Sequence, residues 1–420
     1  MRVHFTNLGC KLNQAETERL ARQFAAAGHQ VVGSLAEADL HVVNSCTVTR
    51  LAAHDSRKAA GRARRRGSLA RTVLTGCHAS AAPEEGARIA GVDLVVPNAG
   101  KDNLLARVEA AFPDLVPGVD PEPAVPYASL PFANTRALVK VEDGCNMRCS
   151  FCVIPFTRGM QRSRPLPEIV EEVRDLVRRG YREIVVTGVQ ISAYRWQEAR
   201  LAGLVRAILA ETDLARLRLT SIAPWDLDEG LLDLWDDRRL CRHLHLSLQS
   251  GSTPTLRRMR RPYTAKSYLG LLARVRAAVP GVAVTTDIIV GFPGETEAEH
   301  AESLATVEAA GFAKIHVFPY SPRPGTEAER LPFQVSAGEK KKRMERMLQA
   351  ARRAEREFQR AHLGKRETVL WEKPKAGVGH GLTDNYLRVV CKDGASLWNR
   401  FSEVELTEIT EEGLAGRIVA

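Results

Sequence analysis

The sequence contains no uninterrupted apolar run of about 18 residues, the minimum for a helix that crosses a membrane. Its opening stretch, MRVHFTNLGCKLNQ, also contains no apolar core like that of a signal peptide. The two absences argue against a membrane protein and against a secreted one. We therefore expect a cytoplasmic protein with no membrane partner.

Cysteine is scarce, with 8 residues in 420, and a reducing compartment disfavours joining them in a disulfide framework. Six of the eight form the two sets described below, and clustering of this kind favours metal binding or catalysis. Cys241 and Cys391 stand alone, and we expect both to be buried structural thiols.

Acidic residues are outnumbered by basic ones, 50 against 60, which gives a formal net charge of +10 and a pI of about 9.3. A surplus of this sign is typical of proteins with a polyanionic partner. Basic residues concentrate in KKKRMERM, which begins a long helical pattern, and in an earlier cluster: Lys58, Arg62, Arg64, Arg65 and Arg66. Such residues either contact phosphates, giving affinity without sequence specificity, or form an ordinary solvated face.

Strand and helix patterns alternate through residues 1–112. The runs RVHFTNLG, ADLHVVNS, RTVLTG and VDLVVPN are typical of strands, and QAETERLARQFAAAG of an amphipathic helix that ends at Gly28. This alternation predicts an N-terminal α/β domain with an open parallel sheet. Cys10, Cys46 and Cys77 each follow a strand, and the carboxyl ends of parallel strands share the edge where ligands bind. We therefore expect the three thiols to converge.

A second α/β series follows residues 113–131, whose six prolines predict an extended linker. Six strand candidates, RALVKVE, REIVVTG, RLRLTSI, HLHLSLQSG, VTTDIIVGFPG and KIHVFPYS, alternate with helical patterns. They predict a partial (β/α)6 barrel over residues 132–361. This region ends in a basic helix from Gly338 to about His362, whose apolar residues are expected to pack against the barrel: Met344, Met347, Leu348, Ala351 and Phe358. Residues 362–420 contain ETVLWEKP, LRVVCK and EVELTEIT between glycine-rich turns and predict a small antiparallel β domain.

Three of the clustered cysteines share one loop, GCNMRCSFC at residues 144–152. Cys145, Cys149 and Cys152 supply three thiolates, which suits a cubane iron–sulfur cluster because its iron atoms prefer sulfur ligands. Structural zinc prefers four protein ligands, and the next candidates downstream are the distant Cys241 and His243. Three ligands on a four-iron cluster leave one iron open to a substrate, so the loop favours catalysis over a structural role.

A Cx3CxxC loop at the end of the first strand of a six-unit barrel resembles the radical S-adenosylmethionine superfamily, and Phe151 precedes the third cysteine as in that motif. The resemblance implies that the open iron chelates the amino and carboxylate groups of S-adenosylmethionine. Electron transfer from the cluster would then cleave the sulfonium and give a 5′-deoxyadenosyl radical. An electron donor such as flavodoxin or ferredoxin is implied as a partner.

The architecture as a whole, apart from the proline-rich linker, resembles the methylthiotransferase family. In that family the first three cysteines hold a second four-iron cluster that carries the sulfur to be inserted, and the C-terminal β domain resembles the RNA-binding module TRAM. The resemblance therefore implies two 4Fe-4S clusters, whose ligands are Cys10, Cys46 and Cys77 for one and Cys145, Cys149 and Cys152 for the other. S-adenosylmethionine is implied both as methyl donor and as radical source.

Other stretches resemble the segments that surround S-adenosylmethionine in this family. CVIPFTRGMQRSRP follows the cysteine loop, and HLHLSLQSGS and DIIVGFPGET match two later strands. The residues implied to contact the cofactor, besides Phe151, are Ser247 and Gln249 at the ribose, Val290 and Gly291 through the backbone, and Thr187 and Gly188 at the methionyl amine. Ordinary βα turns rich in glycine and proline would also produce these patterns.

Three segments, GCKLNQAETE, VFPYSPRPGT and GLTDNYLRV, resemble the family branch that acts on threonylcarbamoyl-adenosine beside the tRNA anticodon. That resemblance implies methylthiolation at C2 of this nucleoside, with the tRNA anticodon stem-loop as partner. Two departures concern the fine substrate contacts. Ala223 stands where the family commonly shows Glu, and Gln190 stands where the branch often has His.

Several alternatives stay open on the sequence. The substrate is alternatively isopentenyl-adenosine in tRNA or an aspartate of a ribosomal protein. A non-catalytic iron–sulfur RNA-binding protein and a zinc-binding RNA module are alternatives of other classes. In the last domain the candidates for base stacking are Trp371, Tyr386, Trp398 and Phe401. We expect at most two of them to be exposed, because a small β domain needs an aromatic core.

Overall fold

The computed structural model describes residues 1–116, 134–227 and 229–419, and the chain divides into two compact units. The first, here called the N-terminal unit, contains residues 1–133, 143–162 and 321–326. The second, here called the barrel unit, contains residues 134–142, 163–320 and 327–420. Within the described ranges, no helix combines the length and the apolar character that crossing a membrane requires.

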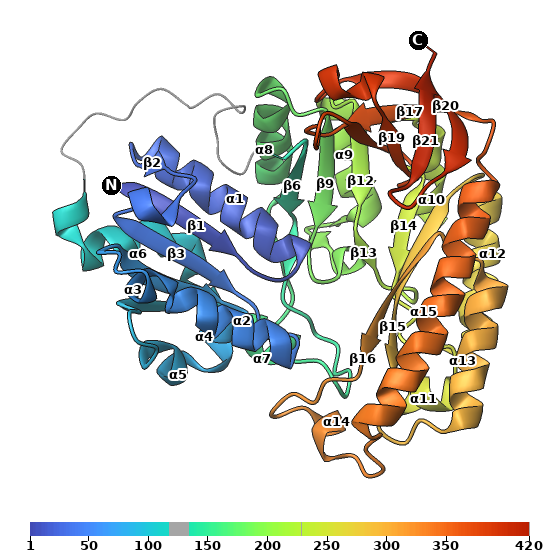
Figure 1. The fold of residues 1–420 in the computed structure, drawn as a ribbon, viewed down its shortest axis with the longest axis horizontal. Coiled ribbons are helices and arrows are strands. Elements are labelled where there is room, and N and C mark those ends of the chain that lie inside the picture. The colour runs from blue at the N-terminus through green and yellow to red at the C-terminus, as the bar shows by residue number, and fades with distance from the viewer. Residues whose placement is uncertain (117–133, 228, 420) are drawn as a thin grey trace. The chain divides into compact units, whose positions relative to one another are not determined.

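The N-terminal unit is built on a five-stranded parallel sheet with the strand order β2-β1-β3-β4-β5 (Figure 1). Its strands are β1 (Arg2–Asn7), β2 (Gln30–Val31), β3 (Leu40–Ser45), β4 (Arg71–Gly76) and β5 (Leu94–Pro97). Its helices are α1 (Lys11–Ala26), α2 (Arg50–Ala60), α3 (Arg62–Arg65), α4 (Cys77–Ala81), α5 (Pro83–Ala87), α6 (Leu104–Ala111) and α7 (Ile154–Arg158). The four predicted strands and the first helix are confirmed, and the edge strand β2 is additional because two residues are too few to show a pattern.

The core of this unit forms where α1 packs on the central strands. Phe5 of β1 meets Phe24 of α1 edge to face, with ring centroids 5.6 Å apart. Phe5 lies opposite Val42 of β3, which in turn lies opposite Val73 of β4, so one register carries the core across the sheet. Every residue of β3 is buried, as expected for the middle strand of a parallel sheet covered on both faces.

In the barrel unit the six predicted strand segments form seven parallel strands in two sheets, β6-β9-β12 and β13-β14-β15-β16, because RLRLTSI contributes both β12 and β13. Their bounds are β6 (Arg136–Lys140), β9 (Glu183–Thr187), β12 (Arg216–Leu219), β13 (Ser221–Ile222), β14 (His243–Leu246), β15 (Ala283–Val290) and β16 (Lys314–Pro319). Only Thr220 separates β12 from β13, so one short segment pairs with the first sheet through β12 and with the second through β13. The six-unit partial barrel is confirmed. The short strands β7 (Glu142–Asp143) and β8 (Arg162–Ser163) flank the cysteine loop.

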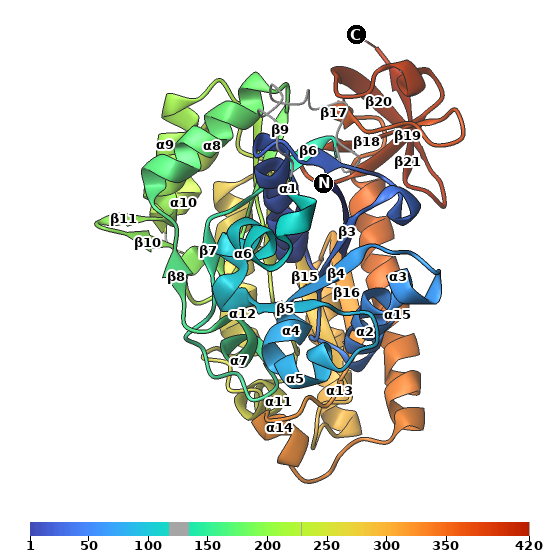
Figure 2. The same cartoon turned by 90° about the vertical axis from the view of Figure 1, so that its left-hand side faces the viewer.

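Helices of the barrel unit follow the strands in the βα order that the sequence predicts. They are α8 (Leu166–Arg178), α9 (Leu201–Glu211), α10 (Glu229–Leu232), α11 (Thr253–Arg258), α12 (Ala265–Ala278), α13 (Glu297–Ala310), α14 (Glu327–Arg330) and α15 (Ala337–Arg360). Figure 2 shows the small hairpin of β10 (Arg195–Trp196) and β11 (Ala199–Arg200) projecting from this unit. In α15, Met347 and Ala351 are buried and the other three predicted packing residues are partly buried, which confirms the apolar stripe.

The last part of the barrel unit is a closed five-stranded β-barrel with the order β17-β18-β19-β21-β20. Its strands are β17 (Arg366–Trp371), β18 (Gly379–Thr383), β19 (Arg388–Cys391), β20 (Phe401–Ile409) and β21 (Leu414–Ile418). The small β domain is confirmed, although β19 and β21 pair in parallel while the other pairs are antiparallel. The sequence did not reveal β18 and β21, because the glycines in GHGLT and LAGRI interrupt the alternation of side chains.

The predictions for the isolated cysteines and for the linker differ in how far the structure tests them. Cys241 and Cys391 are both buried, as predicted. Pro113–Leu115 forms a short 3-10 helix at the start of the predicted linker, and residues 117–131 lie outside the described residues. The predicted domain boundaries at 112, 131 and 361 stay predictions.

Candidate functional site

The N-terminal unit brings Cys10, Cys46 and Cys77 to one edge of its sheet. Cys10 caps α1 shortly after β1, Cys46 directly follows β3, and Cys77 begins α4 directly after β4. These three strands are consecutive in the sheet order, so their carboxyl ends lie at the same edge. Cys46 and Cys77 are buried, and Cys10 is exposed.

The packing of Cys46 against the turn before Cys10 depends on Gly9. The backbone of Gly9 has φ +97, a region that residues with a side chain rarely adopt. A Cβ atom at this position would lie 2.7 Å from both Cβ and Sγ of Cys46. Glycine before the first cysteine therefore leaves the space that the Cys46 side chain occupies.

Electrostatics tie the three thiols together. Burial, reinforced by the neighbouring thiols of Cys77 and Cys10 and opposed by Arg158, raises the pKa of Cys46 to about 11. A thiol with such a pKa is protonated near neutral pH, and a bound metal ion is what converts it to a thiolate ligand. The three side chains thus form a soft, sulfur-only donor set whose buried members suit a metal cluster better than free anions.

The surroundings of Cys77 contain polar atoms that the described residues leave without partners. The side-chain amide of Asn98 donates to Cys77 Sγ at 3.7 Å and to the carbonyl oxygen of Thr157 at 2.9 Å. In the described part of the chain, the buried atoms Asn98 Oδ1 and His78 Nε2 have no hydrogen-bond partner. Unpaired buried polar atoms are rare in folded proteins, and hydrogen bonds to cluster sulfurs are a known means of tuning such clusters. The edge therefore fits a bound iron–sulfur group.

The other three cysteines lie in a loop that folds back on itself within the same unit. Cys145 N donates to the carbonyl oxygen of Gly159 at 3.1 Å, and Cys152 N donates to that of Cys149 at 3.1 Å. Gly144 has φ +75, and a Cβ there would collide with the backbone of Met160, so the base of the loop closes only on glycine. Cys145, Cys149 and Cys152 are all partly exposed.

No group of three or more Cys, His, Asp and Glu side chains that would hold a single metal ion occurs among the described residues. A cubane cluster does not need such a group, because its three thiolates each bind a different iron atom. Both cysteine sets therefore fit a four-iron cluster by the chemistry of their donors, three thiolates each.

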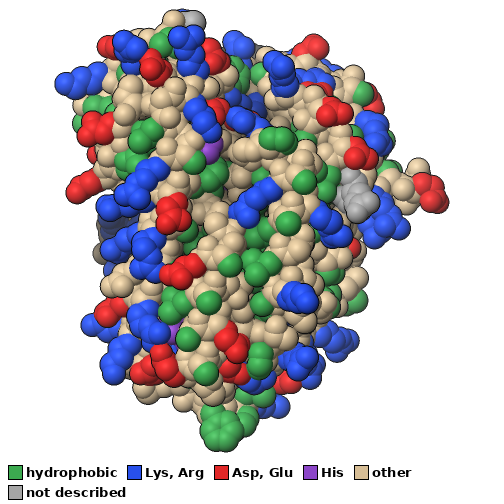
Figure 3. Space-filling model, turned by 90° about the vertical axis from the view of Figure 1, so that its right-hand side faces the viewer, with side chains coloured by type: hydrophobic (Ala, Val, Ile, Leu, Met, Phe, Trp, Pro, Cys, Tyr) green, Lys and Arg blue, Asp and Glu red, His purple; other side chains and the backbone are tan. Residues whose placement is uncertain are grey.

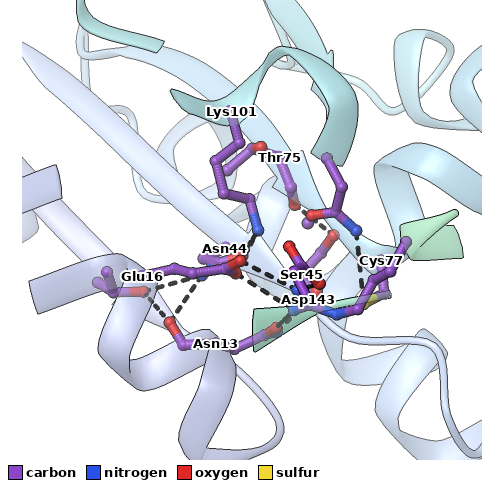
Figure 4. A network of polar contacts seen from close by, with 12 residues as sticks. Asn13, Glu16, Asn44, Ser45, Thr75, Cys77, Lys101 and Asp143 are labelled. Carbon is purple, nitrogen blue, oxygen red and sulfur yellow. Dashed lines mark hydrogen bonds and ion pairs between the residues drawn. The ribbon is translucent and has the colours of Figure 1, made fainter. Parts of the chain in front are cut away.

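A network of buried charges lies beside the thiol edge (Figure 4). The guanidinium of Arg158 donates to Glu16 Oε1 at 3.0 Å and to Asp143 Oδ1 at 2.9 Å. Lys101 Nζ donates to Glu16 Oε2 at 2.6 Å and to Asn44 Oδ1 at 3.1 Å. Sequence reasoning missed all four charged residues, because Glu, Asp, Lys and Arg are normally exposed and these four are far apart in the chain.

The predicted cofactor contacts in the barrel unit lie at the carboxyl ends of their strands. Thr187 ends β9 and Val290 ends β15, with Gly188 and Gly291 directly after them, and Ser247 and Gln249 follow β14. In the loop after β9, Glu142 Oε2 accepts hydrogen bonds from the backbone N–H groups of Val189 and Gln190, both at 2.9 Å. Phe151 lies partly exposed in the N-terminal unit. Their contacts with a cofactor stay predictions.

A histidine in the same part of the barrel unit was also missed. His245 of β14 lies with Nε2 at 3.2 Å from Asp287 Oδ2 and at 3.2 Å from Ser247 Oγ, and with Nδ1 at 3.0 Å from Thr285 Oγ1. His243 and His245 alternate with the buried Leu244 and Leu246, so the signal for a polar face was present in HLHL. The predicted ribose contact Ser247 lies beside His245 on this polar face.

The four base-stacking candidates make contacts with other residues of the barrel unit. Trp371 is completely buried in the core of the small β-barrel, so its prediction as a stacking residue is wrong. Tyr386 stacks on His243 with ring centroids 4.6 Å apart, and Arg216 lies over the ring of Phe401 at 4.7 Å. Lys373 lies over the ring of Trp398 at 5.1 Å. None of the four rings is fully exposed, which agrees with the expectation of at most two.

The two predicted basic clusters differ in how far their side chains are exposed. Lys58 and the four arginines at 62, 64, 65 and 66 are exposed on α2, α3 and the residue after α3. Within KKKRMERM, by contrast, Arg343 is buried and donates to Glu295 Oε1 at 2.8 Å, and Lys340 Nζ donates to the carbonyl oxygen of Tyr320 at 3.2 Å. On the face seen in Figure 3, basic and acidic side chains interleave. The start of α15 is therefore partly a packing element.

A cavity of about 800 Å³ lies within the barrel unit between α15 and the small β-barrel. Arg136 and Lys314, the first residues of β6 and β16, line it, so it lies at the amino ends of the strands. Its further basic lining residues are Arg352, Arg356, Lys375 and Arg388, against the acidic Glu355, Glu411 and Glu412. This cavity is at the opposite end of the strands from Thr187, Ser247 and Val290.

Family models match two parts of the chain. Residues 139–307 match the model of the Radical SAM superfamily, and residues 2–97 match that of the Uncharacterized protein family UPF0004. The first range includes the Cx3CxxC loop and most of the six-strand barrel. The second includes Cys10, Cys46 and Cys77.

Similar proteins align with nearly the whole chain. A threonylcarbamoyladenosine tRNA methylthiotransferase MtaB from Bacillus subtilis (strain 168) is 34% identical over 96% of this chain and 93% of its own. The protein of the same name from Thermotoga maritima is 34% identical over 98% and 96%. A tRNA-2-methylthio-N(6)-dimethylallyladenosine synthase from Novosphingobium aromaticivorans is 36% identical over 98% and 96%.

Solved structures match the fold. The radical S-adenosylmethionine methyltransferase TsrM from Kitasatospora setae, solved with cobalamin and a 4Fe-4S cluster bound, superposes with a TM-score of 0.56. The match covers 78% of this chain and 77% of that one at 18% identity. At this identity the likeness concerns the fold alone.

Proposed function

Because the chain belongs to the radical S-adenosylmethionine methylthiotransferase family, we propose that it is the tRNA enzyme that methylthiolates C2 of N6-threonylcarbamoyladenosine beside the anticodon. The observation that carries this proposal is the pairing of two cysteine triplets with full-length similarity to tRNA methylthiotransferases. Each triplet offers three thiolates and leaves one iron of a cubane cluster open. A single radical site would need only one such triplet.

In this proposal Cys145, Cys149 and Cys152 hold one 4Fe-4S cluster and Cys10, Cys46 and Cys77 hold the other. When bound, the clusters and S-adenosylmethionine would supply the radical, the sulfur and the methyl group. The chain's own residues have to hold, orient and shield these groups. The backbone at Gly9 and at Gly144 supports this role, because each glycine precedes the first cysteine of its triplet and allows a close contact that a residue with a side chain would prevent.

The proposed cofactor contacts follow the same logic. Thr187 and Gly188 are assigned to the methionyl amine, Ser247 and Gln249 to the ribose, and Val290 and Gly291 to backbone contacts. Their common position at the carboxyl ends of β9, β14 and β15 supports this assignment, since ligands of such barrels bind at that face. Glu142 keeps the backbone after Gly188 in place, and Asp287 and Thr285 orient the imidazole beside Ser247. Phe151 is assigned to the same cofactor from the cysteine loop.

Contact with tRNA is proposed for the basic surfaces. The exposed cluster from Lys58 to Arg66 and the cavity lined by Arg352 and Arg356 are the candidates. In the described part of the chain, Arg352, Arg356 and Arg388 form no ion pair, although carboxylates are available nearby. Cations without acidic partners are available for phosphates, which supports a role in holding the anticodon stem-loop.

The substrate branch is tested by nucleoside mass spectrometry of tRNA from a strain that lacks this gene and from the same strain complemented with it. The proposal expects 2-methylthio-threonylcarbamoyl-adenosine to disappear and to return on complementation. Persistence of that nucleoside, with loss of another methylthio species, would contradict the branch assignment.

A second candidate keeps the reaction and changes the nucleoside to N6-isopentenyladenosine. It is favoured by the 36% identity to the dimethylallyladenosine synthase, which is as high as the identity to the threonylcarbamoyl enzymes. Overall identity therefore does not choose between the two, and the choice here depends on GCKLNQAETE and the two further segments that resemble the threonylcarbamoyl branch. The same mass spectrometry distinguishes them directly.

A further inference from the structure

Four charged side chains are buried together in the N-terminal unit: Glu16, Lys101, Asp143 and Arg158. Their side chains retain 4%, 4%, 5% and 1% of their exposure. Removing that many charges from water is costly, and a hydrophobic cluster of similar volume would often be at least as stable. Fold stability alone is therefore a weak explanation for this network.

The geometry links segments that carry both cysteine triplets. Glu16 lies on α1, which Cys10 caps, and its two carboxylate oxygens receive Arg158 on one side and Lys101 on the other. Asp143 immediately precedes the loop of Cys145, and Arg158 at the end of α7 closes that loop onto Asp143. Arg158 also donates to the side-chain oxygen of Asn13. One guanidinium thus connects the beginning of the cysteine loop with the helix that follows Cys10.

The two cations are close to the thiols. Arg158 directly follows Thr157, whose carbonyl oxygen accepts from the Asn98 amide that also donates to Cys77 Sγ. Lys101 lies in the same 3-10 helix as Asn98 and donates to Asn44, two residues before Cys46. The carboxylates of Glu16 and Asp143 balance these two cations in number. Arg162 adds a third cation, which is 48% exposed and contacts the outer oxygen of Asp143 at 3.1 Å. The buried groups beside the thiol edge are therefore two cations held in place by two carboxylates, and loss of either cation leaves a net negative charge there.

We propose that Arg158 and Lys101 are positioning residues of the N-terminal thiol site, which hold its Cys77 side in place and set the reduction potential of the cluster bound there. This inference rests on the proposed function, which assigns a cluster to that site. Reduction adds one electron to the cluster, taken from the titrant, and breaks no bond. Buried positive charge stabilises the more anionic reduced form, because the interior screens charge weakly. Removing either cation therefore makes reduction harder.

The experiment uses the full chain with Cys145, Cys149 and Cys152 replaced by Ala, so that the N-terminal site is the one assigned cluster site left. The protein is reconstituted anaerobically with iron and sulfide, its iron is counted, and it is titrated with dithionite while the reduced cluster is followed by electron paramagnetic resonance. Arg158→Gln and Lys101→Met are each expected to lower the reduced-to-oxidised ratio at a fixed potential about tenfold, a midpoint shift of about 59 mV for one electron. Arg158→Lys, which keeps the charge, is expected to shift the midpoint less.

Two controls separate charge from structure. Arg162→Gln removes the exposed partner of the same carboxylate and is expected to leave the midpoint unchanged, because water screens that charge. The double variant Glu16→Gln/Lys101→Met removes one charge of each sign and is expected to return the midpoint toward the starting value. This variant also avoids leaving an unpaired buried carboxylate, so it stays informative if Arg158→Gln does not fold.

The outcomes are distinguishable. If iron is bound but the midpoint is the same in Arg158→Gln and Lys101→Met, the inference is wrong while the second cluster stands. An equal shift in the charge-balanced double variant also contradicts it, because the effect would then be structural. If the starting variant binds no iron, the second cluster of the proposed function is contradicted and the inference with it.

Discussion

Arg218 and Glu183 form an ion pair that is sealed from solvent, with Nε and Oε1 2.7 Å apart and side-chain exposures of 1% and 0%. Arg218 also donates to the carbonyl oxygens of Thr383 and Asp384 and lies 4.9 Å from the ring centre of Tyr386. Strands β9 and β12 of the partial barrel are thereby joined to the turn after β18 of the small β-barrel. These two parts of the barrel unit therefore share a polar interface.

Replacing Glu183 with Gln is expected to destabilise the barrel unit strongly. The substitution leaves the charge of Arg218 buried without its counter-ion, which typically costs about 3–5 kcal/mol. The measurement is urea unfolding followed by circular dichroism at neutral pH. Glu171→Gln, at an exposed pair with Arg174 and Arg178, is the matched control and should leave the unfolding midpoint in place. Equal midpoints for both variants would show that the buried pair contributes little.

The pH dependence of the same interface follows from Asp384. Burial raises the pKa of its carboxyl, but hydrogen bonds and charge from Arg242, at 2.7 Å, outweigh burial and hold the pKa below 3.8. A group with a lowered pKa in the folded state contributes stability above its unfolded pKa, and this contribution is lost as the pH falls through the folded value. The stability gap between wild type and Asp384→Asn is therefore expected to be full at pH 7 and to narrow below about pH 4.

Unfolding midpoints of both proteins between pH 7 and pH 3 check this expectation. A gap that is constant over the whole range would mean that the charge of Asp384 does not contribute. Glu405→Gln, at the exposed pair with Arg417, serves as the control for general acid unfolding.

Substitution is expected to separate the roles of the two cysteine triplets. Replacing Cys10, Cys46 and Cys77 with Ala should leave about four iron atoms per chain and keep reductive cleavage of S-adenosylmethionine, while methylthiolation is lost. Replacing Cys145, Cys149 and Cys152 should also leave about four but abolish the cleavage. Anaerobic iron analysis and detection of 5′-deoxyadenosine provide the measurements. If the first variant bound all the iron of the wild type, the N-terminal triplet would not hold a cluster.

Charge reversal in the cavity is expected to weaken tRNA binding. Arg352→Glu and Arg356→Glu each remove a cation that has no acidic partner in the described part of the chain, and a lost phosphate contact lowers the salt slope of binding by about one. Arg353→Glu is the control on the same helix, because Arg353 is already paired with Glu308. Filter binding of an anticodon stem-loop at several salt concentrations measures the effect. An equal effect of all three variants would indicate a general loss of charge and no specific site.

Local patterns were sufficient for most of the fold. The apolar runs around Cys10, Cys46 and Cys77 and the six barrel strands were predicted from residues adjacent in the chain, because strand and helix periodicities are local properties. The carboxyl-end rule for parallel strands then predicted that three thiols 31 and 36 positions apart would reach one edge, as the structure shows. Strands β18 and β21 were not predicted, because their glycines carry no side chain that would show the alternation of apolar and polar residues.

The sequence did not show which polar side chains are buried. Glu16, Lys101, Asp143 and Arg158 carry no local signal of burial, and Trp371 carries none that distinguishes a core ring from a stacking platform. Their environment is set by contacts between segments up to 142 residues apart, as between Glu16 and Arg158. The proposal that the six thiols bind iron–sulfur clusters thus came from residue types and spacing, because such clusters are held by cysteine thiolates. Only the tertiary structure determined which charged side chains surround the thiols. A buried charge needs an ion-pair partner to offset the cost of burial, and that partner is set by distance in space.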